Sequence, residues 1–326
     1  MDATASLTPQ ALLHRLEWRV VRRLDGLLQG DYRTLFRGAG IDFTDLREYT
    51  PGDDLRHVDW NVTARMDTPY VREYVEDREV TAWLLLDHSA SMGFGPVDRQ
   101  KDLVLAETAT TLAHVLSRGG NRVGMMLLGD EPGVIDEVIP PGGGRRQVLR
   151  IAGALLAQRA ARAAATDIRA TQADARGRRT RAPGGGTDLG ALLRAGTALV
   201  RRRSLVVVVS DFISSPGWER PLAQLAQRHD VVAIRVVDPR ESELPSAGMV
   251  YVEDAETGEQ IFVDTCDPAF RARLLEAAAA RDEELLSATR AAGVTLHRVG
   301  TDEDLVRTLV RICSLRARAA TSRRAG

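Results

Sequence analysis

Short apolar runs alternate with longer amphipathic stretches along the chain from about residue 80. Five runs, rich in Val, Leu and Ile, predict β-strands over 80–86, 122–128, 205–209, 231–237 and 294–299. Apolar residues at helical spacing predict helices near 98–118, 145–158, 188–202, 217–229, 268–292 and 302–317. Strands that alternate with helices are typical of right-handed βαβ units. The expected fold class is therefore α/β, with a doubly wound, mostly parallel sheet.

The N-terminal part of the chain follows a different pattern. Apolar residues recur every three or four positions over 9–28, which predicts an amphipathic helix, and 29–79 is rich in Gly, Asp and aromatic residues with short extended pieces. We therefore expect residues 1–79 to form a helix plus an irregular β extension that packs on a main domain spanning 80–314.

Three segments interrupt or follow the alternating pattern. Two extended pieces on either side of a Thr-Gly turn predict a hairpin insertion over 248–265. An Arg- and Ala-rich stretch that ends in three glycines, 159–186, is expected to be a flexible connection. The Arg-rich tail 315–326 is expected to be frayed.

Composition limits the class of protein. The chain has 326 residues, of which 44% are hydrophobic and 27% charged, as in ordinary globular domains. No apolar run approaches the roughly 20 residues that a transmembrane helix needs, and no cationic stretch followed by an apolar block suggests a secretory signal. Two cysteines give neither a disulfide framework nor a thiolate metal cluster. We expect a cytoplasmic protein without a membrane span.

The basic residues exclude familiar nucleotide chemistry. Of 44 Lys and Arg residues, one is a lysine, Lys101, and it follows Gln100 rather than a glycine. A phosphate-binding loop of the GxxxxGK[ST] type and a kinase-type VAIK lysine are both absent. A Schiff-base enzyme would depend on Lys101, which the pattern places at a helix without an evident desolvating pocket.

Charge is unevenly distributed. Residues 41–79 hold 11 acidic residues against five arginines, whereas 159–181 holds seven arginines against two aspartates. Such segments are either solvated charged faces or docking surfaces. The basic stretch lacks aromatic residues for base stacking, so nucleic acid is not an expected partner.

Aspartates follow four of the apolar runs, at the positions where ligands bind in open α/β sheets. Aspartate also caps helices and starts loops, so the position alone is weak support for a binding site. The four residues are Asp87, Asp130, Asp211 and Asp238.

Hydroxyl groups distinguish one of these strand ends. Asp87 is followed by Ser89 and Ser91, Thr187 lies between a glycine run and a predicted helix, and Asp211 follows a later strand. Two carboxylates and three hydroxyls, without Cys or His, form the oxygen donor set that Mg²⁺ or Mn²⁺ prefers. The sequence predicts a divalent-metal site there.

These residues resemble the metal-ion-dependent adhesion site of von Willebrand factor A domains. The preceding segment, GAGIDFTDLREYTPGDDLRHVDWNVTARMDTPYVREYVEDRE, resembles the signature of the family of proteins of unknown function called DUF58, in which it precedes a von Willebrand A-type domain. The resemblance covers roughly 29–300. It implies that Ser89 and Ser91 bind the metal directly, that Thr187 binds directly or through water, and that Asp87 and Asp211 bind mainly through water or as exchanging ligands.

The same resemblance implies a function. Proteins of this family are similar to those encoded beside MoxR-type AAA+ ATPases, and they look like adaptors in the chaperone-like maturation of client complexes. The expected function is a non-enzymatic, metal-dependent protein-interaction module whose partners are such an ATPase and its clients.

The signature segment allows two interpretations. The segment could form a packed ion-pair and aromatic network that locks it onto the sheet, made of Asp53, Asp54, Arg56, Asp59, Trp60 and Arg65. Alternatively, Asp53, Asp54, Arg56 and Asp59 could form a docking surface for a partner. In either case Trp60 is expected to be a packing anchor, together with Tyr49.

Two other functions remain open. A metal-dependent hydrolase would need a general base beside the metal, for which Asp130 and His88 are the candidates. No GxSxG elbow surrounds Ser89, which argues against nucleophilic catalysis by that serine. A structural scaffold with a vestigial metal site is the remaining alternative.

Overall fold

A computed structural model of the chain describes residues 8–17, 43–51, 53–54, 58–66, 68–74, 80–95, 99–131, 133–176, 187–253, 260–305, 307–309 and 311. The chain divides into two compact units, one made of 1–36 and 81–326 and the other of 37–80. The expected N-terminal segment 1–79 is thus shared between the two units. Its packing on the main domain, through 37–80, stays a prediction.

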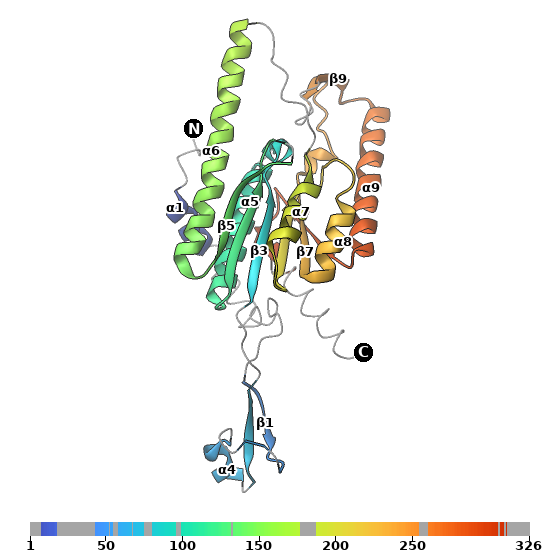
Figure 1. The fold of residues 1–326 in the computed structure, drawn as a ribbon. Coiled ribbons are helices and arrows are strands. Elements are labelled where there is room, and N and C mark those ends of the chain that lie inside the picture. The colour runs from blue at the N-terminus through green and yellow to red at the C-terminus, as the bar shows by residue number, and fades with distance from the viewer. Residues whose placement is uncertain are drawn as a thin grey trace. The chain divides into compact units, whose positions relative to one another are not determined.

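A six-stranded sheet forms the centre of the larger unit (Figure 1). Its strand order is β10-β7-β6-β3-β4-β5, in which β4 and β5 are antiparallel and every other pair is parallel. The expected doubly wound, mostly parallel α/β fold is confirmed. The strands are β3 (Thr81–Asp87), β4 (Arg122–Leu128), β5 (Ile135–Gly142), β6 (Leu205–Ser210), β7 (Asp230–Val237) and β10 (Thr295–Gly300).

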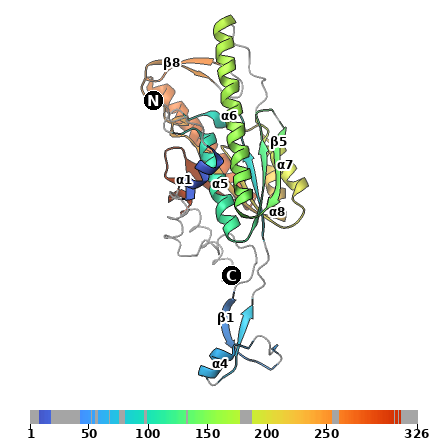
Figure 2. The ribbon, with the colours of Figure 1, turned by 90° about the vertical axis from the view of Figure 1, so that its left-hand side faces the viewer.

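Helices cover both faces of this sheet, as Figures 1 and 2 show. One face carries α1 (Pro9–Leu16), α5 (Lys101–Arg118) and α6 (Gly144–Arg176), and the other carries α7 (Leu189–Leu199), α8 (Glu219–Arg228) and α9 (Pro268–Ala291). β3 and β6 are buried along nearly their whole length because apolar side chains point to helices on both sides. This explains why their sequences are continuous apolar runs.

The strand β5 is absent from the sequence-based prediction. It pairs with β4 at one edge of the sheet and alternates between exposed and more buried positions. Pro140 and Pro141 near its end are tolerated because an edge strand leaves some backbone groups unpaired. An alternating run with two prolines lacks the continuous apolar signal of the central strands.

The prediction of a flexible connection over 159–186 is wrong for residues 159–176. The helix α6 continues to Arg176, so 159–176 is helical, whereas 177–186 lies outside the described residues. Alanine and arginine both have high helix propensity, which explains how a segment without strong apolar periodicity extends the helix. The tail 315–326 also lies outside the described residues.

Smaller elements complete the fold. Within the segment expected to form a hairpin, β8 (Met249–Glu253) pairs with β9 (Gln260–Asp264) in an antiparallel register. Two short 3-10 helices, η3 (Ala90–Gly93) and η4 (Pro239–Glu241), follow β3 and β7. Among the described residues, none of the helices combines the length and apolar character needed to cross a membrane.

The unit 37–80 has its own small structure. β1 (Phe43–Glu48) and β2 (Tyr70–Tyr74) form an antiparallel pair, and α4 (Trp60–Met66) lies between them in sequence.

Candidate metal centre

The strands β3 and β6 are neighbours at the point where the winding of the sheet reverses. From β3 the chain adds β4 and β5 on one side, and from β6 it adds β7 and β10 on the other. Asp87 is the last residue of β3, and Asp211 directly follows β6; their strands run in parallel with Leu86 opposite Val209. Both carboxylates therefore lie at the carboxyl edge of the sheet, where α/β folds place ligands.

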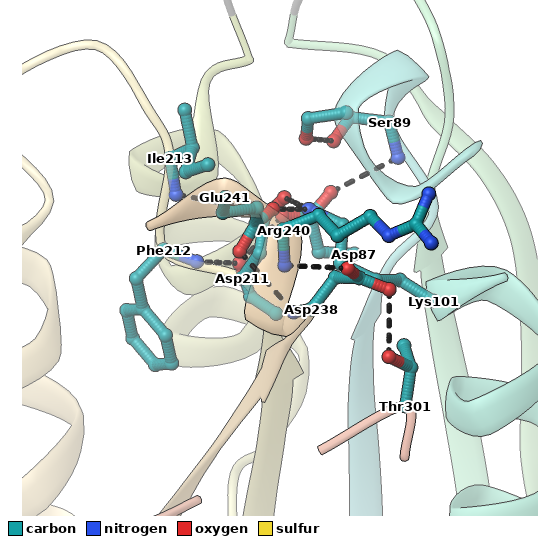
Figure 3. Close-up of polar contacts among 12 residues, drawn as sticks. Asp87, Ser89, Lys101, Asp211, Phe212, Ile213, Asp238, Arg240, Glu241 and Thr301 are labelled. Carbon is teal, nitrogen blue, oxygen red and sulfur yellow. Dashed lines mark hydrogen bonds and ion pairs between the residues drawn. The ribbon is translucent and has the colours of Figure 1, made fainter. Parts of the chain in front are cut away.

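The loop after β3 gathers the first group of oxygen atoms (Figure 3). One oxygen of Asp87, Oδ1, accepts a hydrogen bond from the backbone N–H of Ser89 at 3.0 Å, and Oδ2 accepts one from the Ser210 hydroxyl at 2.6 Å. The hydroxyls of Ser89 and Ser91 lie 3.1 Å apart because the η3 turn brings them to one side. Asp87, Ser89 and Ser91 are all buried.

A strained turn positions Asp211. Phe212 has a φ of 58°, a backbone conformation that non-glycine residues rarely adopt. Its N–H donates to the Ser210 hydroxyl at 2.8 Å, and the next N–H, of Ile213, donates to Asp211 Oδ1 at 2.9 Å. The Phe212 ring packs edge-on against Trp218, with 5.5 Å between ring centroids. Burial of this ring holds the strained turn and, with it, the Asp211 carboxylate.

Thr187 belongs to a third loop that is tied to the loop of Asp211. The Thr187 carbonyl accepts hydrogen bonds from the Ser214 hydroxyl at 2.8 Å and from the Ser215 N–H at 2.9 Å. The residue is buried, and Asp188 beside it caps α7. The structure thus joins Asp87, Ser89, Ser91 and Asp211 in one buried cluster and anchors the Thr187 backbone to the same edge.

Sequence reasoning missed a lysine and a glutamate at this edge. Lys101, the first residue of α5, is fully buried, and its Nζ lies 2.6 Å from Asp211 Oδ2 and 2.5 Å from Glu241 Oε1. Helices that follow parallel strands begin at the carboxyl edge of the sheet, and Lys101 is three and four residues before the buried Val104 and Leu105. These two signals together could have placed the lysine at the site.

Burial and charge set the ionisation of the cluster. Burial, with a further contribution from the negative charge of Asp211, raises the pKa of Asp87 to about 6. Burial alone would lower the pKa of Lys101, but the carboxylates of Asp211 and Glu241 outweigh it and raise that pKa above its ordinary value. The cluster therefore contains the ammonium group of Lys101 and several carboxylates. The charge of Lys101 compensates only part of the repulsion between these carboxylates.

The donor set fits a hard divalent cation. Asp87 and Asp211 offer carboxylate oxygens, and Ser89 and Ser91 offer hydroxyl oxygens. All four residues are buried, and a cation there would stabilise the ionised form of Asp87, which burial and the charge of Asp211 disfavour. Within the described part of the chain, no group of three or more His, Cys, Asp or Glu side chains is placed to hold a metal. This agrees with the chemistry of the site, since half of its four clustered donors are serine hydroxyls.

Helix α6 supports the loop after β3. Arg162 donates to the His88 carbonyl and forms an ion pair with Asp130 at 2.6 Å. Burial, followed by the positive charges of Arg162 and Arg159, lowers the pKa of His88 to about 3. His88 is therefore a neutral imidazole near neutral pH and a weak base.

Asp238, the fourth strand-end aspartate, has a structural role. Its carboxylate caps η4 by accepting from the Arg240 N–H at 2.9 Å and also accepts from the Thr301 hydroxyl at 2.7 Å. Asp130, bound by Arg162, is half exposed. The aspartates after β4 and β7 thus differ from those after β3 and β6, which share the buried cluster.

Comparison with known proteins identifies the family. The family model described as "Protein of unknown function DUF58" matches residues 45–284. The chain belongs to the DUF58 family. The membership expected from the signature segment and the Asp-x-Ser-x-Ser loop is confirmed.

Relatives of this DUF58 chain occur in mycobacteria. "Uncharacterized protein Rv1480" of Mycobacterium tuberculosis is 36% identical over 310 residues, which are 95% of this chain and 90% of that protein. "Uncharacterized protein MAV169" of Mycobacterium avium is 40% identical over 124 residues, or 38% of this chain and 73% of that protein.

Two solved structures are similar to part of this chain. BatB from Bacteroides thetaiotaomicron has a TM-score of 0.43 at 15% identity, with 73% of this chain and 99% of that chain covered. An aerotolerance-related membrane protein from Bacteroides fragilis has a TM-score of 0.39 at 16% identity, with 72% of this chain and 98% of that chain covered.

The DUF58 signature segment uses its acidic residues in several ways. Asp53 accepts two hydrogen bonds from Arg47, at 2.7 and 2.5 Å, and one from the Thr50 N–H at 2.8 Å. Asp59 is buried and caps α4 by accepting from the N–H groups of Asn61 and Val62. Both sets of contacts are internal to the unit 37–80, so the locking of this segment onto the sheet stays a prediction.

Three other residues of the segment differ from Asp53 and Asp59 in their exposure or description. Asp54 is exposed, and Arg56 lies outside the described residues. Trp60 is 67% exposed, so it is not a packing anchor within the unit 37–80, and its packing on the main domain stays a prediction. Trp60 is the first residue of α4, and none of the residues of this helix is buried.

Proposed function

We propose that this chain is a non-enzymatic protein-interaction module that binds partners through a divalent metal, Mg²⁺ or Mn²⁺, at the carboxyl edge of its sheet. The single observation that carries the proposal is the buried cluster of Asp87, Ser89, Ser91 and Asp211. When bound there, the metal would supply an open coordination position for a carboxylate of a partner protein.

Residues of the chain would prepare this site in distinct ways. Asp87 and Asp211 would supply the negative charge, and Ser89, Ser91 and Thr187 would supply neutral oxygens. The Ser210 hydroxyl and the N–H groups of Ser89 and Ile213 orient the two carboxylates. A pre-oriented site lowers the cost of ordering ligands when a cation and a partner bind.

A hydrolase is less well supported by the same geometry. Asp130, one candidate base, is paired with Arg162. His88, the other, has a pKa of about 3 and is nine-tenths or more buried, so it is poorly suited to accept a proton from water. In this proposal the metal would bind a partner protein and would not activate water.

The proposed partner is a MoxR-type AAA+ ATPase, together with the client proteins that it remodels. The family resemblance suggests this partner, and the lack of a GxxxxGK[ST] loop in the sequence is consistent with a motor on a separate chain. The exposed Asp54 and the neighbouring Arg56 are the candidates for a second contact.

Two measurements test the proposal. Calorimetry of the full chain with MgCl₂ and MnCl₂ should give saturable binding that Asp87→Ala abolishes. A pull-down with the ATPase encoded beside this chain should retain the ATPase with Mg²⁺ and lose it with EDTA or with Asp87→Ala. Arg122→Met, at the opposite end of β4, should bind metal and partner like the wild type. Absence of metal binding would favour a structural scaffold, and metal binding without the ATPase would reject this partner.

A further inference from the structure

Lys101 is unusual both in sequence and in position. It is the single lysine of the chain, and it is fully buried at the start of α5. Its ammonium group bridges two carboxylates from separate loops, Asp211 after β6 and Glu241 in η4 (Figure 3). The ammonium also lies 5.9 Å from the centre of the Phe94 ring. A buried cation with this surrounding is a fixed part of the site rather than a solvated surface charge.

The ammonium group uses an oxygen that the metal site would need. Asp211 Oδ1 accepts from the Ile213 N–H, and Oδ2 is bound by Lys101 at 2.6 Å. Both oxygens of Asp211 are therefore engaged within the chain. A divalent cation bound beside Asp211 would lie close to the ammonium and be repelled by it, because the two positive charges would share one carboxylate.

Glu241 offers the ammonium a second position. Its Oε1 lies 2.5 Å from Lys101 Nζ, and its Oε2 accepts from the Asp238 N–H at 3.3 Å. Asp238 is in turn fixed by the Arg240 N–H and the Thr301 hydroxyl. The Glu241 carboxylate is thus held in place by η4 independently of Asp211, and it would keep Lys101 paired if Asp211 were released.

We propose that Lys101 is a built-in counter-ion of Asp211 that competes with the divalent metal, and that metal binding moves its ammonium from Asp211 towards Glu241. This inference rests on the metal site proposed above. It assigns Lys101 and Glu241 as residues that set metal affinity without being ligands. It also links the site to η4, the turn that precedes the β8–β9 hairpin.

A single lysine makes the proposal directly observable. Full-length protein labelled with ¹³Cε-lysine gives one lysine Cε–Hε signal, which reports Lys101 alone. Titration with diamagnetic Mg²⁺ should shift this signal saturably, with the midpoint found by calorimetry. A merely structural Lys101–Asp211 pair would leave the signal in place while the metal binds elsewhere in the cluster.

Variants give the second readout, the affinity for Mn²⁺ in calorimetry. Lys101→Met keeps much of the side-chain volume and removes the charge, and it should bind Mn²⁺ at least about tenfold more tightly. Glu241→Gln removes the second partner of the ammonium, so binding should weaken several-fold. Arg122→Met removes a positive charge at the opposite end of β4 and should match the wild type.

The outcomes separate this inference from the proposed function. If Mg²⁺ saturates the wild type but leaves the lysine signal unmoved, or if Lys101→Met binds no more tightly, the inference is overturned and the metal site stands. If only Lys101→Met binds metal, the inference is supported and metal dependence of the wild type is rejected. If neither protein binds, both ideas fail. Should Lys101→Met not fold, unchanged or tighter binding by Glu241→Gln overturns the inference.

Discussion

At the edge of the main sheet, Asp87 and Asp211 are both buried, and burial, with a further contribution from the negative charge of Asp211, raises the pKa of Asp87 to about 6. In the unit 37–80, Asp53 is only partly buried, and its pKa is held below the ordinary value by Arg47 and the Thr50 N–H. The ionised form of Asp87 is thus disfavoured by its surroundings, whereas Asp53 is stabilised in its ionised form by Arg47 and Thr50 of its own turn. The comparison favours the sheet edge over the acid-rich segment as the location of the proposed metal.

The largest expected effect concerns the strained turn that builds the sheet-edge site. Phe212→Ala should lower the free energy of unfolding by about 3–5 kcal/mol, because a buried ring that packs on Trp218 is lost. Phe212→Gly should be about 1 kcal/mol more stable than Phe212→Ala, since glycine adopts a positive φ without strain. Urea denaturation measures both values.

Trp218→Ala serves as the control for this pair, since it removes the other ring and keeps the strained backbone. If Phe212→Gly were less stable than Phe212→Ala, the positive φ would not be a source of strain. The sheet edge would then be held by ring packing alone.

The second prediction tests which acidic region binds the metal. At pH 8, above the Asp87 pKa of about 6, Asp87→Asn should weaken Mg²⁺ binding at least about 100-fold, or about 2.7 kcal/mol, because a ligand charge is lost. Asp53→Asn in the unit 37–80 should leave the affinity unchanged. Calorimetry compares the two, and equal weakening would remove the distinction between the regions.

Much of the fold could be predicted because its central strands are buried on both faces. A short continuous apolar run between turn signals, such as 205–209, predicts a strand that is buried on both faces. β5 was missed because an edge strand carries an alternating pattern and tolerates Pro140 and Pro141. The second half of α6 was missed because its Ala- and Arg-rich sequence has high helix propensity but lacks apolar residues at helical spacing.

The candidate site was only partly predictable for a different reason. Asp87, Ser89 and Ser91 lie within five residues, so a local motif reveals them. Lys101 meets Asp211 and Glu241 only through the winding of the sheet, because these two residues lie 110 and 140 positions away from it along the chain. A local pattern cannot show that a lysine is buried against a carboxylate so distant along the chain.

A smaller effect is expected where an acidic residue caps a helix. Asp59→Ala should destabilise α4 by about 1 kcal/mol, because the N–H groups of Asn61 and Val62 lose their acceptor. Hydrogen exchange of these two amides should accelerate by about fivefold. Asp54→Ala, at an exposed neighbour, should leave their exchange unchanged. If Asp54→Ala had the same effect as Asp59→Ala, the assignment of Asp59 as the cap would be incorrect.

The smallest effect concerns the pH dependence of Asp53. Since its native pKa lies below the ordinary value of 3.8, its contacts stabilise the unit above about pH 3.8 and are lost as the pH falls towards the native value. A carboxyl NMR titration should place the Asp53 midpoint below 3.8. Arg47→Met or 1 M NaCl should raise this midpoint, because an exposed ion pair is screened by salt. The rise should be incomplete, since the Thr50 N–H and hydroxyl still donate to Asp53. A midpoint raised towards that of Asp87 would instead mean that Asp53 is an unsatisfied carboxylate, and the contrast between the two regions would disappear.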